Sequence, residues 1–372
     1  MGSETNERVL MGPGPSDVHP NVLREMAKPL LGHLDPAFLT VMNETMSLLR
    51  QVYQTENKLT LAMSGTGSAG METVFVNLVE PGDKVVICVN GLFGQRMVDV
   101  ASRCGATVIE VKAPWGEIID ITKVKTTLEQ HPDVALVAVV HAETSTGVLQ
   151  PLEQLSQIVH DYEALFVCDM VTSLGGVPTL IDERKIDAAY SGTQKCLSAP
   201  PGLAPVTFSE RAVHKMEKRK TKVQSWYLDL SMIQNYWGEE RSYHHTAPIT
   251  MVYGLHESLR LIINEGLEQV FERHRHFGEA LHKGLDQMGL KLLVQKEHRL
   301  PQLTSVLIPD GVDDVNVRKQ LLTKYGIEIG GGLGELKGKV WRIGLMGFNA
   351  KQRNVTLFLA ALQDVLATNS KA

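Results

Sequence analysis

Two residues with reactive side chains each follow an apolar stretch of the sequence. Lys195 lies in a loop of small residues, Gly and Pro just after the apolar residues 186–190, and Asp169 ends the apolar stretch 164–169. Ligands of parallel-sheet proteins bind beyond the carboxyl ends of the strands. A lysine amine can form a Schiff base with the aldehyde of pyridoxal 5'-phosphate (PLP), and a carboxylate can pair with its protonated pyridine nitrogen. Lys195 and Asp169 are therefore predicted as the catalytic pair of a PLP site. Taken singly, each residue also fits a plainer interpretation, as a surface charge or a turn residue.

A glycine-rich segment matches the Gly-x-Gly-x-x-Gly pattern of dinucleotide-binding folds between an expected strand and an expected helix. The following strand ends at Asn90-Gly91, without the acidic residue that would hold a ribose hydroxyl. A helix start still offers free N–H groups and a positive dipole end to a single phosphate group. Thr66, Gly67 and Ser68 are therefore predicted to bind a phosphate, the alternative being a turn that only packs helix on strand.

Further residues at the same expected sheet edge have two interpretations each. Phe93 could stack on a flat heterocycle or belong to the core. The hydroxyls of segment 143–147, Thr144 among them, could bond the phenolic oxygen of the cofactor or form an ordinary loop. Arg342 could bind a substrate carboxylate in a bidentate manner or face solvent. His141 and the pair His244-His245 lack the spacing of metal ligands, so no metal is expected.

The 372-residue chain is long enough for two domains, or three, with a large core. Its net charge of −5 provides no basic field for nucleic acid, and no apolar run is long enough to span a membrane. The four cysteines form no Cys-x-x-Cys pair and the polar N-terminus has no signal-peptide core, which favours a cytoplasmic protein. The last residues, Ser370-Lys371-Ala372, only faintly resemble a peroxisomal address.

Strand-like and helix-like segments alternate along the chain between residues 58 and 169, which predicts an α/β fold with a mostly parallel sheet covered on both faces. Residues 9–20 are rich in Gly and Pro and are expected to be extended. A helix is expected over 35–54, and a long helix over about 249–288. The expected parts are an N-terminal arm (1–20), a large PLP-binding domain (21–265) and a small C-terminal α+β domain (266–372).

These residues together resemble a known family. The chain resembles the fold-type I PLP enzymes of aminotransferase class V, and most of all their alanine–glyoxylate aminotransferase group, which implies a seven-stranded, mostly parallel sheet. The resemblance covers the whole chain in the same order. The matching segments are 11–16, 64–67, 90–96, 145–151, the Asp169 strand, the Lys195 loop, 243–246, 331–334 and 342–344.

The resemblance implies a role for single residues. Lys195 forms the Schiff base and moves the proton, and Asp169 keeps the pyridine nitrogen protonated. Phe93 and Val171 cover the two faces of the ring, and Thr144 reaches the phenolic oxygen. Arg342 binds the carboxylate of the amino acid or keto acid. The phosphate is surrounded by Thr66, Gly67, Ser68 and Gln194, with Tyr243 and Thr246 of the partner subunit, which implies a homodimer with shared active sites.

The activity that the resemblance implies is a ping-pong transamination from a small amino acid, alanine first, to glyoxylate. Serine, ureidoglycine, 3-hydroxykynurenine and pyridoxamine are alternative donors, since Phe93 and Ser68 replace the Trp and His usual in animal members of the group. A PLP-dependent lyase is the rival reaction class. A desulfurase would need a mobile catalytic Cys, and no Cys follows Cys196. A nicotinamide-dependent dehydrogenase is disfavoured by Asn90.

Overall fold

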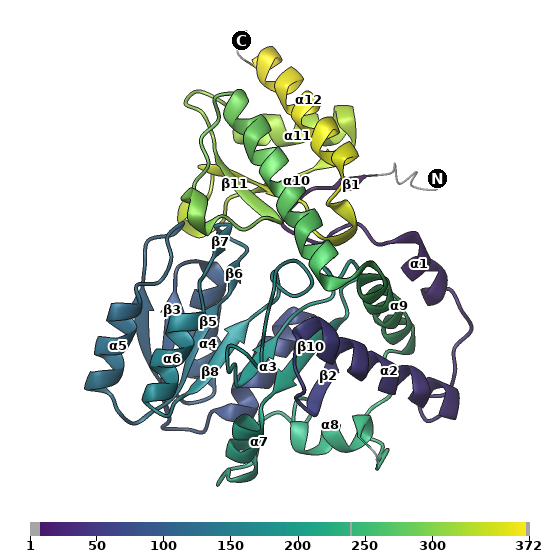
Figure 1. Cartoon of the computed structure of the whole chain (residues 1–372), viewed down its shortest axis with the longest axis vertical. Helices are drawn as coiled ribbons and strands as arrows, with labels where there is room; N and C mark the ends of the chain where they lie inside the picture. The colour runs from purple at the N-terminus through teal and green to yellow at the C-terminus, as the bar shows by residue number, and fades with distance from the viewer. Residues whose placement is uncertain (1–7, 239, 370–372) are drawn as a thin grey trace.

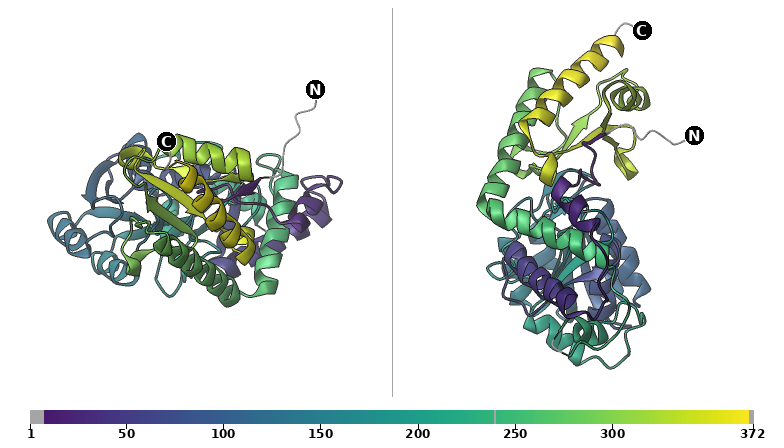
Figure 2. Two further views of the ribbon diagram at one scale, coloured as in Figure 1. Left: turned by 90° about the horizontal axis from the view of Figure 1, so that it is seen from above. Right: turned by 90° about the vertical axis from the view of Figure 1, so that its right-hand side faces the viewer.

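The structure is a computed structural model that describes residues 8–238 and 240–369, and it has two parts. Segments 1–7 and 370–372, on which the expectations about a signal peptide and a peroxisomal address rest, lie outside the described residues. Figure 1 shows a large part below and a smaller C-terminal part above, and Figure 2 shows the helix α12 (Gln352–Asn369) at the end farthest from the large sheet. Each part has a hydrophobic cluster of its own.

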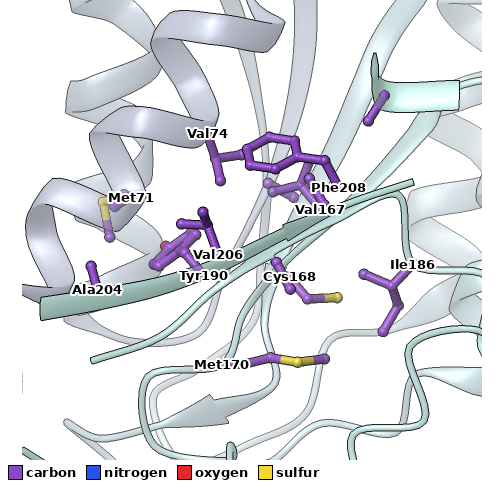
Figure 3. Packing of buried hydrophobic residues seen from close by; sticks show 14 of the residues in the cluster. Met71, Val74, Val167, Cys168, Met170, Ile186, Tyr190, Ala204, Val206 and Phe208 are labelled. Atoms are coloured by element: carbon purple, nitrogen blue, oxygen red, sulfur yellow. The ribbon is translucent and has the colours of Figure 1, made fainter. Parts of the chain in front are cut away.

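The large part is built on a sheet of seven strands, as the family resemblance implied. Six strands are parallel, and β10 lies antiparallel between β2 and β9. Every residue of β8 is buried, so both faces of the sheet are covered there. Figure 3 shows Val167 and Cys168 pointing to opposite sides of that strand. The strands, in spatial order, are β2 (Leu59–Ser64), β10 (Leu203–Phe208), β9 (Ala188–Tyr190), β8 (Leu165–Asp169), β5 (Val134–Val140), β3 (Lys84–Val89) and β4 (Thr107–Lys112).

The helix expected over 35–54 begins where the sequence predicts. In α2 (Pro36–Tyr53), the Asp35 carboxylate accepts the N–H of Ala37 at 2.8 Å and Pro36 occupies the first turn. Four more helices occupy the segment 58–169, where helix-like and strand-like stretches were expected to alternate: α3 (Gly67–Leu78), α4 (Leu92–Arg103), α5 (Ile121–Gln130) and α6 (Glu153–Asp161).

One expectation about the fold was wrong, and the structure adds details that were not predicted. The helix predicted over 249–288 is two helices, α9 (Ile249–Glu265) and α10 (Leu267–Gln287), because Gly266 between them has a φ of 92°. The segment expected to be extended over 9–20 pairs only as β1 (Val9–Leu10). The structure also contains short helices that the sequence pattern did not reveal: α1 (Pro20–Met26), α7 (Glu210–Glu217) and α8 (Leu230–Trp237).

The smaller part contains an antiparallel sheet of β11 (Leu303–Leu307), β14 (Val340–Gly344) and β13 (Gly330–Gly331). The helices α11 (Asp314–Tyr325) and α12 pack against each other, and α12 also packs on α10. β1 pairs in parallel with β12 (Ile327–Glu328), so the N-terminal arm joins the C-terminal part. The division of the chain at residues 20 and 265 stays a prediction.

Two features are absent from the described part of the chain, a helix that could span a membrane and a cluster of metal ligands. None of its helices has the length and apolarity that crossing a membrane requires. No group of three or more His, Cys, Asp and Glu residues there could hold a metal ion.

Candidate active site

Lys195 is buried between the sheet edge and the N-terminal arm. Its exposed fraction is 7%, and its amine donates a hydrogen bond to the carbonyl of Pro13. The arm comes so close that a Cβ at Gly14 would lie 2.5 Å from the Lys195 Nζ atom. Burial, and then the charge of Arg342, lower the pKa of Lys195 from 10.5 to about 8. A neutral amine, the form that attacks an aldehyde, is therefore accessible near neutral pH.

The arm also holds the main chain of the lysine loop. The Ser16 hydroxyl donates to the carbonyl of Lys195 at 2.7 Å, and the Ser16 N–H donates to the carbonyl of Gln194 at 2.9 Å. On the other side, the Ser198 hydroxyl accepts the N–H of Phe348 from the C-terminal part at 2.8 Å. Contacts from both ends of the chain thus fix the lysine loop on the sheet.

Asp169 ends β8 with a carboxylate that is 2% exposed. Burial raises the pKa of Asp169 from 3.8 to about 7, while two hydrogen bonds and the charge of Lys195 oppose this rise. One oxygen accepts the N–H of Val171 at 2.9 Å, and the other accepts the hydroxyl of Tyr190 at 2.8 Å. The two predicted catalytic groups therefore lie within electrostatic reach of each other at the carboxyl edge of the sheet.

The start of α3 has the features of an anion site. Thr66 is the N-cap residue, yet its side chain makes no capping hydrogen bond. The N–H of Ala69 donates to the carbonyl of Thr66 at 2.7 Å, which leaves the N–H groups of Gly67 and Ser68 for a ligand. Gly67 lies close to the loop, because a Cβ there would be 3.4 Å from Val171 and 3.5 Å from Gly192. The side-chain oxygen of Gln194 is buried without a partner among the described residues, and Gln194 would bind a phosphate through the NH₂ group of the same amide. The arrangement fits a phosphate group.

Phe93 lies half-buried at the start of α4, next to the core of the large part. The guanidinium of Arg96 lies 4.9 Å from the centre of the Phe93 ring, and its Nη1 is 3.5 Å from the hydroxyl of Ser68. Arg96 thus contacts both the ring of Phe93 and the hydroxyl of Ser68. Stacking of Phe93 on a heterocycle stays a prediction.

Arg342 does not face solvent, which removes one of its two interpretations. Its exposed fraction is 6%, and burial lowers the pKa of Arg342 from 12.5 to about 10. Its Nε donates to the carbonyl of Gly331 at 2.8 Å, and Nη1 donates to the carbonyl of Thr144 at 3.1 Å. The Thr144 hydroxyl lies 2.5 Å from that of Thr172. Arg342 therefore crosses from the small sheet to the loop that follows β5.

Tyr243 and Thr246 are not joined to this cluster. Both are exposed, Tyr243 at 62%, and none of the hydrogen bonds in the described part of the chain connects either residue to Lys195, Asp169 or Arg342. The Tyr243 ring packs against His33, 5.2 Å away. The prediction that they enter the active site of a partner subunit stays a prediction, because the structure contains a single chain.

Glu143 was missed as a site residue. It is fully buried, and burial raises its pKa. One oxygen accepts the N–H and hydroxyl of Ser145 at 3.0 and 2.6 Å, and the other accepts the N–H groups of Phe93 and Gly94 at 3.3 and 3.4 Å. Glu143 thus caps the start of α4 from another segment and places Phe93. A carboxylate directly after an apolar strand was the only signal for it.

Tyr190 and Pro13 were also missed. Tyr190 ends β9 opposite Asp169, in register with it. A hydroxyl at the carboxyl end of an apolar strand could have marked this residue. No sequence signal pointed to the carbonyl of Pro13, because its contact with Lys195 depends on how the arm folds back over 182 residues of chain.

A comparison with known proteins identifies the family of the chain. The model of the family described as aminotransferase class V matches residues 12–352. The chain belongs to the class V aminotransferases. It is 42% identical to the (S)-ureidoglycine–glyoxylate transaminase of Bacillus subtilis over 96% of this chain and 90% of that protein. It is also 42% identical to the mouse alanine–glyoxylate aminotransferase over 96% and 87% of the two chains.

Solved structures of class V aminotransferases share the whole architecture. The structure of an alanine–glyoxylate aminotransferase from Nostoc sp. superposes with a TM-score of 0.96 at 52% identity, over 98% of this chain and 97% of that chain. The fold is therefore that of the fold-type I aminotransferases, and PLP is the cofactor of this family. The buried amine of Lys195, the carboxylate of Asp169 and the free helix start at Thr66 fit the aldehyde, ring nitrogen and phosphate of PLP.

Proposed function

We propose that this class V aminotransferase transfers the amino group of alanine to glyoxylate in two half-reactions. The observation that carries the proposal is the meeting of Lys195, Asp169 and Arg342, three buried ionisable groups from separate segments, at one sheet edge. The relatives from Bacillus subtilis, mouse and Nostoc sp. are all named as glyoxylate aminotransferases. A small donor such as alanine is in keeping with the mouse and Nostoc relatives.

Each side chain has a task in this scheme. Lys195 would hold the cofactor through its amine, and the same amine, once free, would accept the Cα proton of the substrate and donate it again. PLP, when bound, supplies the electron sink for this proton transfer. Asp169 holds the proton of the pyridine nitrogen in place. Arg342 binds the substrate carboxylate through its planar fork of N–H donors.

We propose the remaining cofactor contacts from the same geometry. Phe93 and Val171 cover the ring, and Thr144 lies at the phenolic oxygen. The phosphate contacts are Thr66, Gly67, Ser68 and Gln194. Since Tyr243 and Thr246 are exposed, they are free to complete the phosphate site of a second copy in a homodimer. Trp226 and Tyr227, 60% and 42% exposed, extend the aromatic surface beside them and support such an interface.

Ureidoglycine is the second candidate donor. The Bacillus subtilis relative, a ureidoglycine–glyoxylate transaminase by name, is as similar to this chain as the mouse alanine–glyoxylate enzyme. Serine, 3-hydroxykynurenine and pyridoxamine remain weaker alternatives, and a PLP-dependent lyase is the rival reaction class.

A donor panel with glyoxylate and pyruvate as acceptors tests the substrate assignment. We expect alanine with glyoxylate to give the highest kcat/KM. A clear preference for ureidoglycine would replace the alanine assignment. Repeated turnover with release of ammonia in the absence of an acceptor would indicate a lyase, because a transaminase without an acceptor stops after one keto acid per active site. The purified protein should be yellow and should bleach on borohydride reduction. Lys195→Ala should lose both the reducible colour and transamination, and full activity in that variant would overturn the proposal.

The carboxylate site has its own test. Arg342→Leu should raise KM for alanine and for glyoxylate about a hundredfold, because a charge-assisted bidentate contact is lost. Arg260→Leu is the matched control, since Arg260 pairs only with Glu257 at 2.9 Å on the surface of α9. An unchanged KM for alanine in Arg342→Leu would remove Arg342 from the proposed site.

A further inference from the structure

We propose that Tyr190 is a positioning residue, which orients the carboxylate of Asp169 and keeps it ionised toward the pyridine nitrogen of PLP. This inference rests on the proposed role of Asp169. Tyr190 ends β9, and its hydroxyl donates to Asp169 Oδ2 at 2.8 Å. Both side chains are buried, with exposed fractions of 0% and 2%. Neither group can therefore replace this hydrogen bond with one to bulk water.

The backbone places the two residues opposite each other. β8 and β9 are parallel, and Asp169 is in register with Tyr190. The N–H of Met170 donates to the carbonyl of Tyr190 at 2.8 Å, so Tyr190 holds the end of β8 through its main chain as well as its side chain. Figure 3 shows the Tyr190 ring packed near Val206 and Met71, which fixes its direction. The hydroxyl is thus presented to the carboxylate by a rigid support.

The hydrogen-bond count of Asp169 leaves room for the cofactor. A carboxylate has about four acceptor positions. Val171 occupies one on Oδ1, and Tyr190 occupies one on Oδ2. Each oxygen therefore keeps capacity for the N–H of a pyridine ring. Without Tyr190, Oδ2 would have no donor from the protein and the carboxylate could rotate about its Cβ–Cγ bond.

The charges and hydrogen bonds around Asp169 act in opposite directions on its ionisation. Burial and the carboxylate of Glu143 favour the protonated acid, whereas Lys195 and the bonds from Val171 and Tyr190 favour the carboxylate. Tyr53 of α2 and Tyr190 both remain protonated, because burial raises the pKa of each hydroxyl well above 10. The backbone N–H of His141 donates to the backbone carbonyl of Asp169, and the imidazole of His141 is neutral because burial lowers its pKa to about 3.

The test compares two Tyr→Phe variants of the holoenzyme. Tyr190→Phe removes the bond to Asp169 and keeps the ring. Tyr53→Phe is the matched control, since Tyr53 is equally buried and near the same carboxylate, but its hydroxyl donates to the carbonyl of Pro205 at 3.0 Å. PLP affinity is measured by equilibrium dialysis, and the pH dependence of kcat and of the visible absorbance of bound PLP is recorded for each protein.

We expect Tyr190→Phe to bind PLP about tenfold more weakly than Tyr53→Phe, the cost of one hydrogen bond to a charged group. The acidic limb of its kcat profile should move to higher pH, because Asp169 then protonates more readily. A purely structural role would lower the stability of both variants alike without moving that limb. Equal PLP affinities and superimposable pH profiles in the two variants would overturn the inference.

A double variant separates an effect through Asp169 from a general loss of stability in Tyr190→Phe. In an Asp169→Asn background, Tyr190→Phe should change PLP affinity less than twofold, because the two residues act as one unit. A full tenfold effect in that background would show that Tyr190 does not act through Asp169. If Asp169→Asn itself binds PLP as tightly as the wild type, the proposed function of Asp169 fails, whereas a loss in Asp169→Asn with none in Tyr190→Phe overturns only the role of Tyr190.

Discussion

Two buried carboxylates at the same sheet edge, Asp169 and Glu143, have different hydrogen-bond environments. Glu143 receives four hydrogen bonds, two on each oxygen, from Ser145, Phe93 and Gly94. Asp169 receives two, one on each oxygen, from Val171 and Tyr190. Burial raises the pKa of both. Glu143 is therefore saturated by its own chain, whereas Asp169 retains acceptor capacity.

The difference separates a structural carboxylate from one that can serve a ligand. A saturated carboxylate fixes the segments that donate to it, here the start of α4 with Phe93. A half-saturated one at the mouth of a site is costly to bury unless a further donor arrives. The pyridine nitrogen of PLP, when protonated, is such a donor. Counting donors at each buried carboxylate thus distinguishes the two roles where burial alone does not.

The largest effect is expected from Asp169→Asn. The amide has the shape of the carboxylate but no charge for the protonated ring nitrogen, so kcat/KM for alanine should fall about a thousandfold. Steady-state kinetics at saturating PLP measure the effect, and the stability of the PLP-free variant should not decrease. A loss below tenfold would place Asp169 with Glu143 among the structural carboxylates.

The pH dependence of stability should distinguish the PLP-free protein from its Asp169→Asn variant. The pKa of Asp169 is about 7 in the folded state and 3.8 ordinarily. Between these values the folded state retains a proton that the unfolded chain has lost, so stability falls as pH rises. Asp169→Asn should remove up to about 4 kcal/mol of this decline. Urea unfolding at several pH values in that range measures the free energy of unfolding of both proteins. If it declined equally with pH in the two, the prediction would be contradicted.

Glu143→Gln should affect stability before chemistry. Two of the four acceptor positions become an NH₂ group that faces the N–H groups of Phe93 and Gly94, so the free energy of unfolding should fall by about 3 kcal/mol. Activity of the folded fraction should fall less than in Asp169→Asn. Denaturant unfolding and kinetics on the same preparation decide this, and an activity loss as large as that of Asp169→Asn would assign Glu143 a direct role.

Ser145→Ala is the mildest test of the comparison. It removes one of four donors to Glu143, as Tyr190→Phe removes one of two to Asp169. We expect a loss of about 1 kcal/mol in unfolding free energy, with the pH profile of kcat unchanged. If the acidic limb of the kcat profile shifted in Ser145→Ala, the ionisation of Glu143 would influence catalysis despite its four hydrogen bonds.

Much of the fold could be predicted because its signals are local. Apolar stretches located the strands β2, β3, β4, β5 and β8, and Asp35-Pro36 marked the start of α2. The same locality explains what was missed. Strand β10 was not predicted, and only its pairing with β2 and β9 shows it to be antiparallel. A single glycine, Gly266, divides a continuous helical pattern in two.

The sequence by itself determined the chemistry: a lysine and an aspartate after apolar strands, a glycine turn before a helix, and an arginine in a late strand. Residue types and short spacings carry that information. Only the tertiary structure decided which groups meet, as when Pro13 reaches Lys195, Arg342 reaches the carbonyl of Thr144, and Tyr190 takes one oxygen of Asp169. Such contacts join segments far apart in the chain, and their formation depends on packing and loop closure rather than on neighbouring residues.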